Sequence, residues 1–157
     1  MERKGRASRH VNSPADVVFG VVIDLNRLPA WNRRMTGVVE VPPNLTTGAE
    51  WVVAFRLLGK RFNSRSVLLE LDEGRRRFSH RSKPEDDDPS STVWTWEVEP
   101  EGTGSRVTLS WDLQPVTRFR RLVAAPVRAW QIPRTDAPQS LAALARECEA
   151  RVGPLDA

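Results

Sequence analysis

The sequence predicts an α+β fold in which one antiparallel β-sheet is covered by helix. Apolar side chains alternate with period two between residues 36 and 113, which indicates strands. Only polar residues and prolines separate successive strands, so no crossover helix fits between them and the sheet must be antiparallel. Helical spacing returns after residue 118. We expect one domain over residues 1–157, with an ordered core from roughly 6 to 151.

The first elements are a strand and two short helices. Residues 6–11 read as the strand, and the polar segment after it has the features of a helix start. Ser13 is a suitable N-cap and Pro14 suits the first helical position. Residues 17–23 are apolar on most sides, which predicts a buried helix. A second short helical or turn segment is expected over residues 24–32.

The first strands of the sheet carry their apolar residues on one face. After a strand at 36–41, the next strand shares the set Trp51, Val53, Phe55 and Leu57. A two-residue hairpin turn within Leu58–Arg61 sets the register of the strand that follows. That register adds Phe62, Ser64, Ser66 and Leu68 to the same face. The apolar pattern then shifts by one residue, which predicts a bulge within residues 66–68.

A second tight turn is predicted at Glu73–Gly74. It would create two oppositely charged cross-strand pairs, Asp72 with Arg75 and Glu70 with Arg77.

The remaining strands complete the meander. Phe78 and His80 are expected to point inward from the first of them. The last two strands have inner faces of alternating residues: Thr92, Trp94, Trp96 and Val98, then Val107, Leu109, Trp111 and Leu113.

A helix is predicted to close the chain. Its apolar stripe has helical spacing and comprises Phe119, Leu122, Val123, Val127 and Trp130. Pro126 should kink this helix, Pro133 should interrupt it, and residues 136–139 should restart it.

Several stretches of the sequence resemble a known family. They are Ser13–Phe19, Asp24–Leu25, Leu28–Asn32, Gly48–Trp51, Gly104–Leu109 and Ser140–Leu144 with Glu147. Together they are similar to the START-like, or SRPBCC, helix-grip superfamily, within its polyketide cyclase/dehydrase and lipid transport group. The resemblance implies a curved six- to seven-stranded antiparallel sheet wrapped around a long C-terminal helix, with two short helices between strands 1 and 2. Relatives usually have an unbroken final helix, whereas prolines divide it here.

The same superfamily includes lipid carriers, cyclases and hormone receptors, so the fold does not determine function. We expect an internal apolar cavity that binds a hydrophobic lipid, aromatic or polyketide-like molecule. Twelve side chains are expected to line it: Trp51, Phe55, Ser64, Ser66, Phe78, His80, Trp94, Trp96, Trp111, Phe119, Val123 and Trp130. A fully packed core without a cavity is the alternative.

The sequence offers little catalytic chemistry. His80, with Ser64 or Ser66 as pocket hydroxyls, is the one candidate for a cyclase or dehydratase. A lone inward histidine is more often simply hydrogen-bonded. Cys148 and two distant histidines make no ligand set, so neither a metal nor a cofactor is expected.

The net charge of +4 is carried mostly by arginine. Six arginines are expected on the outer face of the sheet: Arg56, Arg61, Arg65, Arg75, Arg77 and Arg81. Acidic residues share that face, so a mixed-charge surface is favoured over a nucleic-acid or membrane site. A basic interaction module with a closed core is a second alternative. The sequence shows no signal peptide and no membrane-inserting segment, and a cytoplasmic location is expected. The sequence does not predict the oligomeric state.

Overall fold

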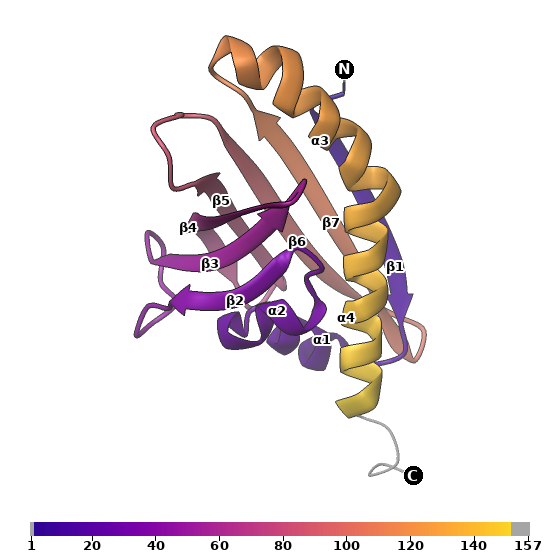
Figure 1. Cartoon of the computed structure of the whole chain (residues 1–157). Coiled ribbons are helices and arrows are strands. Elements are labelled where there is room, and N and C mark those ends of the chain that lie inside the picture. The colour runs from indigo at the N-terminus through magenta and orange to yellow at the C-terminus, as the bar shows by residue number, and fades with distance from the viewer. Residues whose placement is uncertain (1, 152–157) are drawn as a thin grey trace.

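The computed structural model describes residues 2–151 and confirms the α+β fold with a single antiparallel sheet (Figure 1). Its seven strands lie in the order β1-β7-β6-β5-β4-β3-β2. Their bounds are β1 Lys4–Val11, β2 Met35–Glu40, β3 Glu50–Leu57, β4 Lys60–Asp72, β5 Arg77–Pro84, β6 Ser91–Glu101 and β7 Gly104–Gln114. Two short helices, α1 (Ala15–Val22) and α2 (Leu28–Trp31), with the 3₁₀ turn η1 (Leu25–Arg27) between them, separate β1 from β2.

The turn predicted within Leu58–Arg61 has Leu58 and Gly59 as its two loop residues, and it sets the register of β3 against β4. Both turn residues have positive φ, 54° and 77°, which suits the tight turn that joins twisted strands. Phe55 therefore lies opposite Phe62, and Trp51 lies opposite Ser66. The expected bulge also occurs, but it lies between Leu68 and Glu70, slightly beyond the predicted position.

The turn predicted at Glu73–Gly74 is wrong. The backbone N–H of Arg75 donates to the Asp72 carboxylate at 3.0 Å, and the chain forms a four-residue loop over 73–76. Asp72 is consequently paired with Arg77 instead of Arg75. Glu70 becomes a diagonal neighbour of Arg77, and the two side chains still form an ion pair at 3.3 Å.

The predicted Ser13 cap is also wrong. Because α1 begins at Ala15, Pro14 occupies the N-cap position and Ser13 lies one residue too early. Ser13 is buried, and its backbone carbonyl accepts a hydrogen bond from the Ser105 hydroxyl at 2.9 Å.

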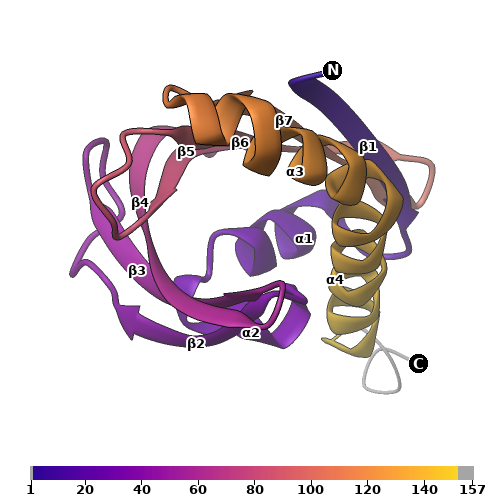
Figure 2. The same ribbon diagram turned by 45° about the horizontal axis from the view of Figure 1, so that its top comes forward.

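The C-terminal helix runs through its prolines by changing its hydrogen-bond pattern. It comprises η2 (Arg120–Ala124), α3 (Ala125–Gln131), η3 (Ile132–Asp136) and α4 (Ala137–Arg151). The η segments are π-helical, so the interruption predicted at Pro133 takes this form. The N–H groups of Ala125 and Ala137, each just before a proline, donate to carbonyls five residues back. Figure 2 shows that α3 and α4 follow different directions.

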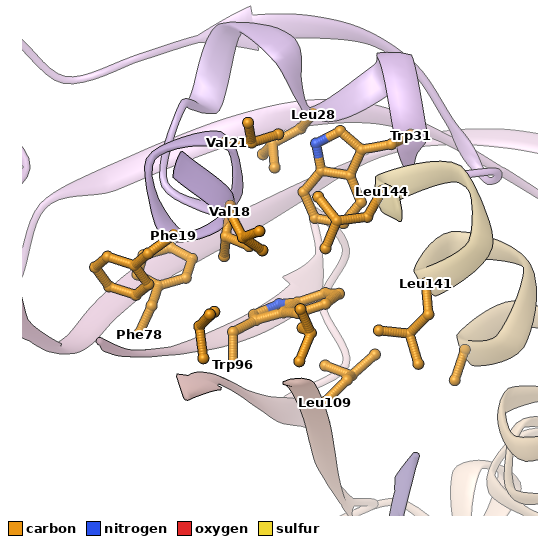
Figure 3. Close-up of a cluster of buried hydrophobic side chains, with 14 of the residues drawn as sticks. Val18, Phe19, Val21, Leu28, Trp31, Phe78, Trp96, Leu109, Leu141 and Leu144 are labelled. Atoms are coloured by element: carbon orange, nitrogen blue, oxygen red, sulfur yellow. The ribbon is translucent and has the colours of Figure 1, made fainter. Parts of the chain in front are cut away.

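The buried core lies between one end of the concave sheet and α1, α2 and α4. Trp31 of α2 meets Trp96 of β6 edge to face, with ring centroids 5.2 Å apart. Leu141 and Leu144 approach this pair from α4 (Figure 3). The segment α4 packs against β1, α1 and α2, whereas η2 and α3 pack mainly against neighbouring helical segments. The other end of the sheet is therefore left without a tightly packed cover.

Close packing of β1 against β7 leads to a testable prediction about Gly104. A Cβ atom at this position would lie 2.3 Å from the Val11 carbonyl oxygen, so Gly104→Ala should destabilise the protein by about 1–3 kcal/mol. Gly20→Ala is the matched control, because nothing lies within 4 Å of its added methyl group and alanine favours a helix by up to about 1 kcal/mol. Urea denaturation measures both, and equal effects would contradict the proposed clash.

Candidate functional site

A cavity of about 750 Å³ lies between the concave face of the sheet and the first half of the C-terminal helix. Its walls are mostly apolar. The sheet contributes large side chains from several strands, including Val53, Phe55, Phe62, Trp94, Trp96, Leu109 and Leu113. The helix contributes Phe119, Val123 and Val127 from the opposite side. A fully packed, closed core is thereby contradicted.

Eight of the twelve predicted lining residues lie in the wall of this cavity. They are Phe55, Ser64, Ser66, His80, Trp94, Trp96, Phe119 and Val123. Strand alternation explains this result, since these sheet residues share the inner face that the register defines.

Trp51 and Phe78 lie behind the cavity wall instead of on its surface. Their rings stack at 5.9 Å, and both are buried. Both belong to the buried hydrophobic cluster that also includes Phe19 of α1 (Figure 3). The end of the sheet that α1 covers is therefore filled with core side chains.

Trp111 and Trp130 lie outside the lining for two different reasons. Trp111 is paired with Gly5 of β1, whose missing side chain leaves room for the indole: a Cβ there would lie 2.5 Å from the ring. Trp130 is 58% exposed and contacts Arg134, whose guanidinium carbon lies 5.1 Å from the ring centroid. The π-helical η2 adds a residue to its turn, so the regular spacing that grouped Trp130 with Phe119 does not hold across it.

A charged cluster at the edge of the cavity was not predicted. Arg34 and Arg128 both bond to the buried Asp136, at 3.0 and 2.5 Å, and all three residues line the cavity. Burial alone would raise the pKa of Asp136, but the hydrogen bonds and charges of the two arginines outweigh it and lower that pKa. The cluster carries one excess positive charge. Its members are far apart in the sequence, and no sequence motif predicts that they come together.

His80 is the polar group enclosed by aromatic rings on the inner face. Its ring centroid lies 5.1 Å from that of Trp51 and 5.3 Å from that of Phe78. Within residues 2–151 its buried Nδ1 has no hydrogen-bond partner, contrary to the expectation for a lone inward histidine. Burial lowers the pKa of His80 to about 3, so the imidazole is neutral at pH 7.

The acidic loop between β5 and β6 is bonded to the start of the C-terminal helix. Asp86 and Asp88 form ion pairs with Arg120 at 2.8 and 3.3 Å, and Asp88 accepts a hydrogen bond from Thr117 at 2.8 Å. Desolvation alone would raise the pKa of Asp88, but hydrogen bonds from Ser90 and Thr117 and the charge of Arg120 outweigh it and lower that pKa to about 2. The loop therefore holds one rim of the cavity. Among the described residues, no group of side chains is arranged to hold a metal ion.

On the outer face of the sheet, Arg65 and Arg77 pair with acidic residues, in agreement with the predicted mixed-charge surface. Two other arginines predicted there lie elsewhere: Arg75 is in the 73–76 loop, and Arg61 lines the cavity. Arg65 contacts Glu40, Glu50 and Glu85, at 3.1, 3.4 and 2.8 Å. This face therefore has mixed charge instead of one positive field.

Comparison with known proteins identifies both a family and a fold. A family model described as polyketide cyclase/dehydrase and lipid transport matches residues 2–149. The Zhui aromatase/cyclase from Streptomyces sp. R1128 is 18% identical with a TM-score of 0.80, covering 98% of this chain and 97% of that one. The protein TTHA0849 from Thermus thermophilus is 21% identical with a TM-score of 0.73, covering 96% and 99%.

A third structure, the di-domain aromatase/cyclase BexL of the BE-7585A biosynthetic pathway, is 24% identical with a TM-score of 0.74. The alignment covers 98% of this chain and 48% of BexL. A search of curated protein sequences gave no match. At these identities the structural likenesses establish the fold alone.

The buried neutral histidine predicts a specific pH dependence of stability. The pKa of His80 is lower in the folded state than the ordinary value of 6.5, so the unfolded chain binds the extra proton. The free energy of unfolding should fall by about 1.4 kcal/mol per pH unit as the pH drops from 6.5 toward 3. His80→Gln should remove this contribution, and His10→Gln, at a partly exposed histidine, should not. Denaturation at pH 7, 6 and 5 measures the difference, and parallel curves for wild type and His80→Gln would contradict it.

Proposed function

We propose that this chain, which belongs to the polyketide cyclase/dehydrase and lipid transport family, binds and carries a hydrophobic small molecule in its cavity. The observation that carries this proposal is the cavity itself. Its volume of about 750 Å³ falls within the usual range of small-molecule sites, roughly 300–1,000 Å³. Its apolar walls favour a ligand whose binding comes mainly from burial of apolar surface, at about 25 cal/mol per Å².

The charged cluster supports a more specific proposal, an amphipathic ligand with one anionic end. Arg34 and Arg128 share the single carboxylate of Asp136, which leaves one positive charge uncompensated at the cavity edge. Both guanidinium groups carry more N–H donors than Asp136 can accept. A carboxylate or enolate on the ligand would satisfy them, while the apolar body occupies the aromatic end of the cavity.

The second candidate is a cyclase or dehydratase. It is favoured by the structural likeness to proteins named aromatase/cyclases, Zhui and BexL. The environment of His80 argues against acid–base catalysis by this residue, because a pKa of about 3 lies far from neutral pH, where a general acid or base is most effective. We therefore favour the carrier.

Binding in the cavity should be visible in tryptophan emission. Titration with N-phenyl-1-naphthylamine, a neutral apolar probe, should quench Trp94, which lies in the wall. The Trp94→Phe variant should lose most of this change. Trp111→Phe is the matched control and should keep it, since Trp111 lies outside the lining. A signal that depends on Trp111 and not on Trp94 would place the probe elsewhere.

The anionic end can be tested with a matched pair of probes. 1-Anilinonaphthalene-8-sulfonate carries a negative charge on nearly the same framework as N-phenyl-1-naphthylamine. Arg34→Gln should weaken binding of the charged probe about tenfold, as expected when a charge-assisted hydrogen bond is lost. Binding of the neutral probe should be unchanged. Equal losses for both probes would indicate damage to the cavity and contradict an anionic subsite.

Carrier and enzyme differ in what His80→Gln should do. For a carrier, the substitution should change affinity by about 1 kcal/mol, the value of one hydrogen bond. A variant that binds an aromatic polyketide-type substrate normally but no longer converts it would overturn the carrier assignment.

A further inference from the structure

We propose that the first half of the C-terminal helix, Arg118–Arg134, is a docking surface for an anionic lipid bilayer. This inference goes beyond ligand binding in the cavity, and it rests on the exposure and charge of this segment alone. The surface is peripheral, since no helix within residues 2–151 is long and apolar enough to cross a membrane.

The segment exposes an apolar stripe that the fold leaves uncovered. Within residues 2–151, ten large hydrophobic side chains are exposed. Six of them lie in Arg118–Arg134 or just before it: Val116, Phe119, Leu122, Val123, Val127 and Trp130. Leu122 is 69% exposed and Trp130 is 58% exposed, and neither lines the cavity. Their exposure is therefore to solvent. A helix that presents leucine, phenylalanine and tryptophan in this way is suited to the boundary between headgroups and acyl chains.

The charge of the segment complements an anionic surface. From residue 113 to residue 135 the sequence has five arginines and no aspartate or glutamate. Arg120 and Arg128 are paired with acidic residues of the fold. Arg118, Arg121 and Arg134 are exposed and form no ion pair with any residue in the described part of the chain. Basic side chains beside an apolar stripe are attracted to anionic lipid headgroups. The arginines therefore favour an anionic bilayer over a neutral surface as the partner.

The position of the segment connects this surface to the cavity. Phe119, Val123 and Val127 are exposed and also form part of the cavity wall. In Figures 1 and 2, α3 lies along an outer edge of the molecule, away from α1 and α2. A bilayer in contact with this edge would therefore lie directly beside this part of the cavity wall. Ligand exchange with the bilayer would rest on the proposed function, but docking itself does not.

Co-sedimentation of the full chain with vesicles tests the proposal. The protein should bind vesicles of equimolar phosphatidylglycerol and phosphatidylcholine, bind pure phosphatidylcholine much less, and dissociate at high salt. Substitution of Arg118, Arg121 and Arg134 by glutamine should weaken binding by about a hundredfold, because each basic residue near such a surface contributes about fivefold. Leu122→Gln with Trp130→Gln should also weaken it by about tenfold, through lost apolar burial.

Matched controls keep the result specific to this surface. Glutamine at Arg6, Arg56 and Arg75, three exposed arginines elsewhere, removes the same charge and should reduce binding far less. Val39→Gln removes an apolar side chain that is 57% exposed on β2 and should have no effect. Loss of vesicle binding that is equal in the control triple variant would overturn the proposal in favour of non-specific charge attraction. Absence of wild-type binding to anionic vesicles would overturn it outright.

Probe binding in solution separates this surface from the cavity. The surface variants should still bind N-phenyl-1-naphthylamine as wild type does, which shows that they are folded and that the cavity is intact. If vesicle binding is specific but no probe enters the cavity, the proposed ligand-binding function fails and the docking surface stands.

Discussion

The structure depends on how the C-terminal helix accommodates its prolines. A regular helix would have to donate from Pro126 and Pro138, which have no N–H group. The π turns before them move the last available donors to more distant carbonyls and redirect the helix. One half, α4, is thereby placed against β1, α1 and α2 and completes the core. The other half crosses the sheet without packing tightly on it, and the cavity is the space that remains.

This division also determines where polar groups are tolerated. Asp136 lies in η3, between α3, which borders the cavity, and α4, which packs in the core. Arg34 and Arg128 neutralise it there. A buried carboxylate without such partners would cost several kcal/mol in desolvation. His80 solves the same problem differently: between two aromatic rings it stays neutral. The cavity wall thus combines a charged cluster at its edge with a neutral imidazole among apolar and aromatic side chains on the inner face, a combination that suits an amphipathic ligand.

The strands and their inner faces follow from the sequence because each depends on a local pattern. Period-two alternation and a two-residue turn within Leu58–Arg61 are sufficient to place Phe55 and Phe62 on the same face. The turn at residue 73 was mispredicted because a side chain, Asp72, competes for the backbone. Lining residues were predicted where the strands define them. The prediction of lining residues fails where another part of the structure determines the side-chain position. The ring of Trp111 lies over Gly5 of β1, and Trp130 follows a π turn that changes the helical spacing. The Arg34–Asp136–Arg128 cluster could not be predicted at all, because it forms only when the helix returns to α2.

The weakly packed half of the helix explains why apolar residues persist there without burial. In a helix that only closed a core, the outward positions would be expected to be polar. Leu122 and Trp130 face solvent, and their apolar exposure is unfavourable in water. Arg118, Arg121 and Arg134 are exposed beside them and lack acidic partners within the described residues. The acidic loop before β6 holds Arg120 and Thr117, which fixes the start of the helix at the cavity rim. The segment is therefore held in place at one end by ion pairs and at the other by α4, and it exposes Leu122 and Trp130 beside the cavity wall formed by Phe119, Val123 and Val127.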